Sequence, residues 1–310
     1  MKAVGGGIGL TVGSNAFATR AKAVDSVTVR QNNRDLRGQQ ERCIISEDLH
    51  SALKIPINGQ IRVGGQNDET KYESGLYTVT ETNLESTTVE MSKDGLDRLD
   101  FTNNSSGFVD PNAPHPEYET REMADKNDEY VEILVDNEEQ SDLVACAPHG
   151  GWIEYRTDAQ SAYVATALDV TEWSCAGYNS GGGAYDRWHI TSTAIDRRSF
   201  PKLDSIGDRE FTHAVSFHGF SRSGVVIGGN ADNDLKKRMR DEIDSLTNGK
   251  YDITLADSDS PYSGTSSENF VNWLTKDGDG IQIEQGWEAR TTDWKTIATA
   301  VVKVYRDRVL

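Results

Sequence analysis

The chain has 310 residues, with 50 Asp and Glu against 32 Lys and Arg, and a formal net charge of −18. A nucleic-acid binder neutralises phosphates with a surplus of basic residues, so this balance excludes that class and disfavours docking on anionic lipid. The acidic surplus is typical of a surface adapted to high salt, as in a protein of a haloarchaeon or its virus, because the Debye length falls to about 3 Å at 1 M salt. An ordinary acidic protein is the alternative.

The lengths of the apolar runs and the spacing of the cysteines bear on further classes of protein. The sequence contains no run of about 18 apolar residues, so it predicts no membrane-spanning helix. The three cysteines are too far apart for a zinc knuckle and allow at most one disulfide. The sequence contains no signal for the oligomeric state.

Residues 1–20 are typical of an export signal. Lys2 precedes the Gly-rich apolar run AVGGGIGLTV, and Ala16-Phe17-Ala18 supplies an A-x-A cleavage pattern. The mildly apolar run is typical of twin-arginine signals, although the twin arginine itself is absent. We therefore expect a secreted protein, with a cytoplasmic or virion-associated location as the alternative, and we set residues 1–20 apart from the fold.

Short alternating runs predict a small β domain over residues 21–100. The strand-like runs are Val24–Val29, Arg42–Ile45, Gln60–Val63, Gly75–Thr80 and Ser86–Met91, and turn pairs such as Asn58-Gly59 separate them. The domain carries no catalytic constellation, which favours a binding or spacer role. Residues 101–117 are rich in Asn, Ser and Pro, a composition that predicts a linker.

Residues 118–310 predict an α/β domain. We expect strands at Tyr130–Val135, Asp142–Ala147, Trp188–Thr193, Ala214–Phe217 and Ile281–Glu284, and helices at Tyr118–Asn127, Ala159–Leu168, Asp232–Leu246 and Asp293–Arg308. Strands that alternate with helices imply a mostly parallel or mixed sheet with helices on both faces. Ligands of such sheets bind at the carboxyl ends of the strands.

Three of the predicted strand ends carry side chains that bind metals. His149 and Glu154 are five residues apart across a Pro-Gly-Gly turn, and the two glycines allow the chain to fold tightly there. His218 ends a second strand and Glu284 a third. Two histidines and one carboxylate, with one position open for water, form the ligand set of a catalytic zinc, and a further carboxylate can act as general base. The set therefore favours a zinc hydrolase, although each piece alone is more typical of a turn or a solvated strand end.

Six sequence blocks occur in a characteristic order between residues 118 and 308: CAPHGGWIE, HITSTAID, SFHGF, VVIGGNAD, GTSSENFVN and GIQIEQ. Together they resemble the phage and bacterial poly-γ-glutamate hydrolases, relatives of the zinc carboxypeptidases. The resemblance implies a carboxypeptidase-like mixed sheet flanked by helices, here preceded by the small all-β domain. It also implies one Zn²⁺ ion held by His149, Glu154 and His218, with Glu284 as general base and acid.

Two positions depart from the family pattern. Ala194 stands where the family usually has His, and Trp273 follows Asn272 where the family usually has Arg. Neither is an implied metal ligand, so the departures bear on how the substrate is held more than on the class of reaction.

The predicted function is hydrolysis of the γ-glutamyl amide bonds of poly-γ-glutamate, so the expected partner is an anionic polymer or a peptide. The candidate substrate-binding residues are His189, Arg187, Arg222, Asn269 and Asn272, and Arg290 is a further candidate for stabilising the oxyanion. Surface ion pairs are the alternative for the arginines, and a structural role is the alternative for His189.

Two other functions remain open. One is a zinc carboxypeptidase or N-acyl-amino-acid deacylase that acts on a small substrate. The other is an inactive binding or virion structural module, and the intact set of two histidines and two glutamates argues against it.

Overall fold

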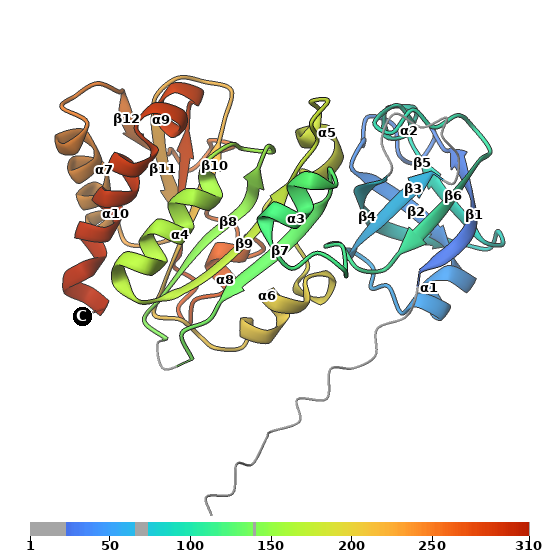
Figure 1. Ribbon diagram of the computed structural model, residues 1–310, viewed down its shortest axis with the longest axis horizontal. Coiled ribbons are helices and arrows are strands. Elements are labelled where there is room, and N and C mark those ends of the chain that lie inside the picture. Colours follow the sequence, from blue (N-terminus) through green and yellow to red (C-terminus); the bar gives the residue numbers. More distant parts are fainter. Residues whose placement is uncertain (1–22, 66–73, 139–140, 310) are drawn as a thin grey trace, which may run out of the picture.

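The computed structural model describes residues 23–65, 74–138 and 141–309. These residues form a closed six-stranded barrel and a seven-stranded mixed sheet (Figure 1). The predicted export signal, residues 1–20, lies outside the described residues. No helix in the described part of the chain is long and apolar enough to cross a membrane.

The barrel closes in the strand order β1-β5-β2-β4-β3-β6. Its elements are β1 (Val24–Gln31), β2 (Arg42–Ser46), α1 (Glu47–Leu53), β3 (Gln60–Gly65), β4 (Ser74–Asn83), β5 (Thr88–Met91), α2 (Lys93–Asp97) and β6 (Ser105–Asp110). Each of the five predicted β runs overlaps one of the first five strands. Their alternate apolar side chains, such as Val27 and Val29 of β1, fill the barrel core.

The sixth strand lies inside residues 101–117, which the composition predicts as a linker. β6 buries a single large aliphatic side chain, Val109, and its next residue, Asp110, pairs with Arg62 of β3. The two apolar residues of β6, Phe108 and Val109, are adjacent and give no alternating pattern, so the sequence did not predict this strand. The division of the chain at residues 100 and 117 therefore cuts through the barrel.

The second sheet has the order β12-β11-β13-β10-β8-β9-β7. Its strands are β7 (Tyr130–Val135), β8 (Leu143–Gly151), β9 (Thr171–Gly177), β10 (His213–Gly219), β11 (Val225–Gly229), β12 (Ile253–Leu255) and β13 (Ile281–Gln285). Strands β9, β8, β10 and β13 are parallel neighbours, whereas β7 and β11 run antiparallel to β9 and β13. The carboxyl ends of β8, β10 and β13 therefore meet at one edge, as the sequence predicts.

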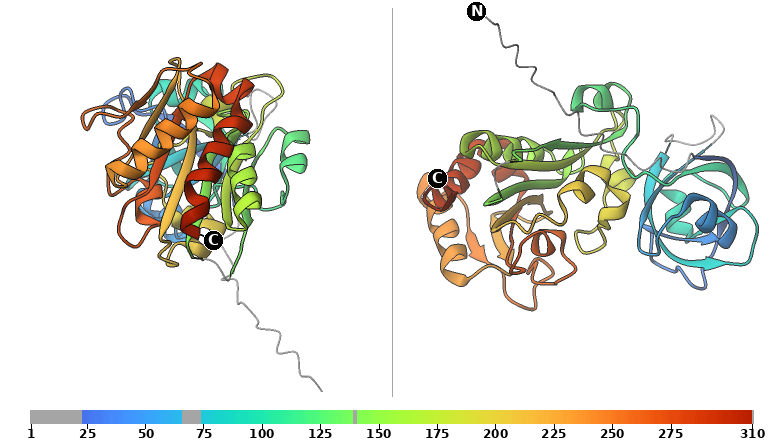
Figure 2. Two further views of the ribbon diagram at one scale, coloured as in Figure 1. Left: turned by 90° about the vertical axis from the view of Figure 1, so that its left-hand side faces the viewer. Right: turned by 90° about the horizontal axis from the view of Figure 1, so that it is seen from below.

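Helices cover both faces of this sheet (Figure 2). They are α3 (Arg121–Lys126), α4 (Thr157–Leu168), α5 (Ala184–Trp188), α6 (Pro201–Ile206), α7 (Asn233–Leu246), α8 (Phe270–Trp273), α9 (Trp287–Thr292) and α10 (Trp294–Val309), with a 3₁₀ turn at Arg197–Ser199. Leu143 and Ala145 of β8 pack in one core with α4, α7 and α10, while Val144 and Cys146 pack in a second core with α6 and α8. The expected mixed sheet with helices on both faces is confirmed. Cys43, Cys146 and Cys175 are buried free thiols.

The predicted strand at Trp188–Thr193 is wrong. Gly182 and Gly183 adopt left-handed backbone angles (φ +80° and +84°), and α5 begins directly after them and ends at Trp188. The buried side chains of Trp188 and Ile190 are what gave the segment its strand-like pattern.

The barrel packs directly on the α/β sheet. Leu76 of β4 belongs to the same core as Trp188, so the two parts share apolar packing. The Gln60 side chain donates a hydrogen bond to Ala194 O at 2.6 Å and accepts one from Asp196 N at 2.9 Å. These contacts fix one side of the barrel against the segment that follows α5.

Candidate metal centre

A bulge at the end of β8 brings His149 and Glu154 together. The register of β8 against β9 shifts between Ala147 and Gly150, and Gly151 follows with φ +68°. A Cβ on Gly151 would lie 2.6 Å from the carbonyl oxygen of Gly177, so the close approach of the two strands requires glycine. The chain then turns back, and Glu154 N donates a hydrogen bond to His149 O at 2.8 Å.

The third candidate metal ligand, His218, comes from β10. Nδ1 of His149 lies 3.2 Å from Oε2 of Glu154, Nδ1 of His218 lies 3.6 Å from the same oxygen, and the two Nδ1 atoms are 3.3 Å apart. Ligand atoms about 2.0–2.2 Å from one ion in a tetrahedral arrangement are separated by about 3.3–3.6 Å. The three atoms therefore fit a single metal ion with one position open.

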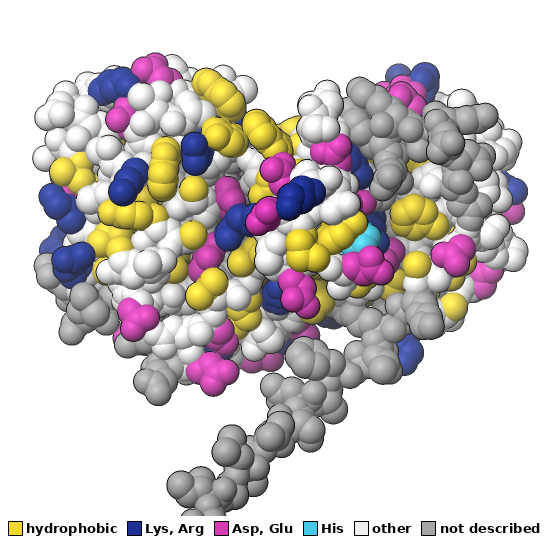
Figure 3. All heavy atoms as spheres, viewed as in Figure 1, with side chains coloured by type: hydrophobic (Ala, Val, Ile, Leu, Met, Phe, Trp, Pro, Cys, Tyr) yellow, Lys and Arg dark blue, Asp and Glu magenta, His cyan; other side chains and the backbone are white. Residues whose placement is uncertain are grey.

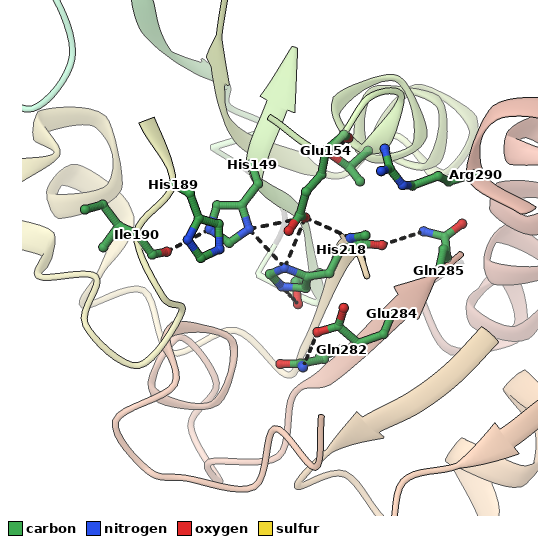
Figure 4. Close-up of polar contacts among 12 residues, drawn as sticks. His149, Glu154, His189, Ile190, His218, Gln282, Glu284, Gln285 and Arg290 are labelled. Carbon is green, nitrogen blue, oxygen red and sulfur yellow. Dashed lines mark hydrogen bonds and ion pairs between the residues drawn. The ribbon is translucent and has the colours of Figure 1, made fainter. Parts of the chain in front are cut away.

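The remaining ring nitrogens are held by their neighbours (Figure 4). Nε2 of His149 donates to Ile190 O at 2.8 Å, and Nε2 of His218 lies 3.1 Å from Ser216 Oγ. Such contacts orient metal-binding histidines and leave the opposite nitrogen for the ion. Gly219 N donates to Glu154 Oε2 at 2.8 Å and fixes the carboxylate as well.

All three donor side chains are buried, and the charge of each one shifts the pKa of its neighbours. Burial opposes the charged form of Glu154, but the charge and hydrogen bonds of His149 and His218 outweigh it and lower the pKa of this carboxyl. Burial lowers the pKa of His218. For His149 burial acts in the same direction, but Glu154 outweighs it and the pKa is raised.

Glu284 lies beside this cluster on β13, where it stands directly opposite His218 in the β10–β13 register. Burial and then the negative charge of Glu154 raise its pKa well above the ordinary carboxyl range. Gln282, two residues earlier on the same face, donates a hydrogen bond to Glu284 Oε1 at 2.8 Å and works in the opposite direction. The carboxyl is thus poised to hold a proton, in contrast to Glu154.

These residues open onto a cavity of about 560 Å³. Its lining includes His149, Glu154, Tyr185, His189, His218, Tyr262, Asn269, Gln282, Glu284 and Arg290. His189 also offers a ligand atom within 4.8 Å of those of His149 and Glu154. Its Nδ1, however, is hydrogen-bonded to Glu41. Nδ1 of His218 lies 3.6 Å from Glu154 Oε2 and 3.3 Å from His149 Nδ1, distances that suit a shared ion, so His218 fits better as the third ligand.

The five predicted substrate-binding residues do not all lie at the cavity. His189 and Asn269 line the cavity, and Arg222 stacks on Tyr262 of the lining at 5.2 Å. Asn272 lies behind the wall and donates hydrogen bonds to the carbonyl oxygens of Gly264 and Ser266, so it shapes the loop that forms the wall.

Arg187 does not reach the cavity, and its predicted role is wrong for this structure. Its side chain is 2% exposed and donates to Ser74 O and Asp128 O between the barrel and the sheet. It also pairs with Glu129 at 3.7 Å. The interface with the barrel therefore occupies the guanidinium that was expected to hold substrate.

Two residues near the metal cluster were not among the predicted site residues. Gln282 shares a strand face with Glu284, and the two-residue period of a strand could have revealed it. Glu41 comes from the barrel, and no local pattern marks it.

The poly-gamma-glutamate hydrolase family model matches residues 117–305. The chain belongs to this family. Among solved structures, a bacteriophage poly-gamma-glutamate hydrolase is 20% identical over 57% of this chain and 88% of its own, with a TM-score of 0.48. Zinc-free YndL is 22% identical over 60% of this chain and 95% of its own, also with a TM-score of 0.48. No curated protein matches.

In this member of the poly-gamma-glutamate hydrolase family, both departures from the expected pattern lie on the barrel side. Ala194 and Trp273 line a second cavity of about 440 Å³, together with Arg42 and Thr78 of the barrel. Thr193 lines this cavity and the one at the metal cluster. The two positions that differ thus face the barrel and not the metal cluster.

Proposed function

We propose that this protein is a zinc-dependent hydrolase that cleaves γ-glutamyl amide bonds of poly-γ-glutamate, on a carboxypeptidase-like sheet. The observation that carries the proposal is the convergence of His149, Glu154 and His218 on one point beside Glu284, in a cavity open to substrate. Membership of the family supports the substrate class.

His149, Glu154 and His218 would hold the ion, since two imidazoles and one carboxylate suit zinc. When bound, zinc supplies Lewis-acid chemistry that allows water to act as a nucleophile near neutral pH. Glu284 takes the proton of the attacking water and passes it to the leaving amine. Its burial and its position opposite His218 support this role. A carboxyl with a raised pKa is a stronger base once ionised, and it keeps the proton until that proton passes to the amine.

Arg290 supports the developing negative charge. It lines the cavity at 9% exposure, and Nη1 donates to Tyr155 O at 3.0 Å. Its buried Nε–H donates no hydrogen bond among the described residues. Burial lowers the pKa of this guanidinium, which nevertheless remains a cation at neutral pH. A cation that is already in place costs no reorganisation when the oxyanion forms.

The test is metal analysis together with hydrolysis of γ- and α-linked polyglutamate. We expect about one zinc per chain, cleavage of the γ-linked polymer, and loss of most activity in Glu284→Gln with the metal retained. Glu242→Gln on α7 is the control, since Glu242 does not line the cavity. Absence of bound zinc, or full activity of Glu284→Gln, would contradict the proposal. Release of C-terminal residues from short peptides alone would favour the carboxypeptidase alternative.

We also propose that the protein acts outside the cell. The export-like pattern of residues 1–20 supports this location, and a polymer is a substrate that an exported hydrolase can meet. Sequencing the N-terminus of the protein recovered from culture medium tests it, since export predicts a mature chain that begins after Ala18.

A further inference from the structure

A side chain of the barrel reaches the wall of the hydrolytic cavity. Glu41 precedes β2, and its Oε1 lies 3.0 Å from Nδ1 of His189, 148 residues away in sequence. The two side chains are 22% and 14% exposed, so the contact is largely shielded from water. Hydrogen bonds to a carboxylate are stronger than neutral ones, and partial burial strengthens them further.

The ring of His189 is held on three sides. Tyr185 stacks on it with a centroid separation of 4.3 Å and an interplanar angle of 18°. The ring of His149 lies 4.4 Å away. Because Nδ1 is bonded to Glu41, Nε2 is the ring nitrogen left to meet a substrate, and no hydrogen bond to it is present among the described residues.

Glu41 is itself anchored. The Arg98 side chain, 7% exposed, donates to the carbonyl oxygens of Gln40 and Leu76 within the barrel. Its Nε donates to Asp186 O, in the helix that carries Tyr185. One buried guanidinium therefore ties the residue before Glu41 to the helix beside His189, and the carboxylate is held at a fixed place relative to the ring.

The charge of Glu41 is also secured. Burial opposes ionisation of this carboxyl, but the hydrogen bond and charge of His189 outweigh burial and lower its pKa. An ionised carboxylate accepts the Nδ1–H of the imidazole and so fixes both the orientation of the ring and the position of its proton.

We propose that Glu41 is a positioning residue of the hydrolytic site, through which the barrel orients His189 so that Nε2 meets a polar or anionic group of the substrate next to His149. This inference rests on the proposed hydrolytic function. It makes the barrel a part of the active site and not a spacer. Glu41 touches neither substrate nor metal, and its effect passes through His189.

A double-mutant cycle tests the proposal. Glu41→Gln keeps the size of the side chain and removes its charge, and we expect it to raise KM for the γ-linked polymer roughly tenfold with a smaller change in kcat. In the His189→Ala background the same substitution should change KM by less than about twofold, because the group through which Glu41 acts is gone. Glu41→Asp, which keeps the charge on a shorter side chain, should give an intermediate KM.

Glu81→Gln on β4 is the matched control, since Glu81 is an exposed carboxylate of the same barrel. Its KM and melting temperature should equal those of the wild type. The imidazole Nδ1–H of His189 gives a second readout by NMR without turnover: its downfield resonance should be missing in His189→Ala and shifted upfield in Glu41→Gln.

Two kinetic outcomes overturn the inference. One is an unchanged KM in Glu41→Gln, and the other is an equal effect of Glu41→Gln with and without His189. If the wild type cleaves none of the polymers, the proposed hydrolytic function fails. An unshifted His189 resonance in Glu41→Gln would also overturn the inference, because it would show that Glu41 does not contact His189.

Discussion

At the scale of single residues, the candidate site contains two carboxyl groups whose pKa values are shifted in opposite directions. Glu154 lies between two imidazoles and is held ionised, which suits a metal ligand. Glu284 is also buried, and burial together with the negative charge of Glu154 favours its neutral form, so the carboxyl can carry a proton. The difference arises from the charged neighbours of each carboxyl, two histidines for Glu154 and Glu154 itself for Glu284.

The role of Gln282 gives a prediction at this scale. Its side-chain N–H donates one hydrogen bond that stabilises the ionised form of Glu284, so Gln282→Leu should raise the pKa of Glu284 further. We expect the Glu284 carboxyl of the metal-free protein to titrate above the ordinary carboxyl range, and to titrate higher still in the variant. Carboxyl carbon NMR measures both, and Glu284→Gln identifies the signal. A lower pKa in Gln282→Leu would contradict the electrostatic account.

The residues of the candidate metal centre were largely predictable from the sequence, whereas the residues that orient the side chains around it were not. The spacing of His149 and Glu154 across two glycines, and the strand ends at His218 and Glu284, are local patterns that a sequence shows. Glu41 contacts His189 only because the barrel folds against the sheet. A contact between residues 148 positions apart leaves no mark on hydrophobic periodicity.

At the scale of elements, the strands that were predicted are those with mainly apolar runs, such as β7 and β10. The sequence did not predict β9, because its buried positions include polar side chains, among them Glu172 and Ser174. Arg121 of α3 bonds both, at 2.6 and 2.7 Å, and makes their burial possible. Burial that depends on a distant partner cannot be read from the strand alone.

The turn after β8 gives a prediction for an element. Gly151 and Gly249 share φ +68°, but a Cβ at Gly249 would meet nothing within 4 Å, whereas at Gly151 it would strike Gly177 O. Gly249→Ala should therefore cost about 1–2 kcal/mol for the left-handed backbone. Gly151→Ala should cost roughly twice as much and weaken metal binding, since the turn places Glu154.

Urea denaturation and a metal-competition titration of both variants measure these effects. Metal affinity should fall in Gly151→Ala alone. Equal losses of stability in the two variants would show that the close approach to Gly177 is relieved without cost.

At the scale of the whole molecule, a buried set of charges joins the barrel to the sheet. Arg62 of β3 lies 2.8 Å from Asp110 of β6 and 3.5 Å from Glu129 next to β7, and Arg187 pairs with the same glutamate. Buried charges of this kind are costly unless each keeps its partners. The two parts are therefore held in one relative position, which the coupling of Glu41 to His189 requires.

The net charge of −18 leads to the last prediction. Basic side chains are interspersed among acidic ones on the face in Figure 3, so the acidic surplus is spread and not gathered in one patch there. At low salt this surplus repels an anionic polymer over a Debye length of about 30 Å at 0.01 M, whereas at 1 M the length is about 3 Å. Arg290 lines the cavity, and a hydrogen bond from it to a substrate would be about 3 Å long, so salt would screen that contact little.

We therefore expect kcat/KM for long γ-linked polyglutamate to rise with NaCl over the range in which the melting temperature shows an intact fold. A short γ-glutamyl amide without free carboxylates is the control, and its kcat/KM should stay nearly constant because net repulsion does not act on it. A steep fall of kcat/KM for the polymer, with the control unchanged, would mean that long-range attraction guides the substrate. It would then count against a surface adapted to high salt and against net repulsion of the polymer.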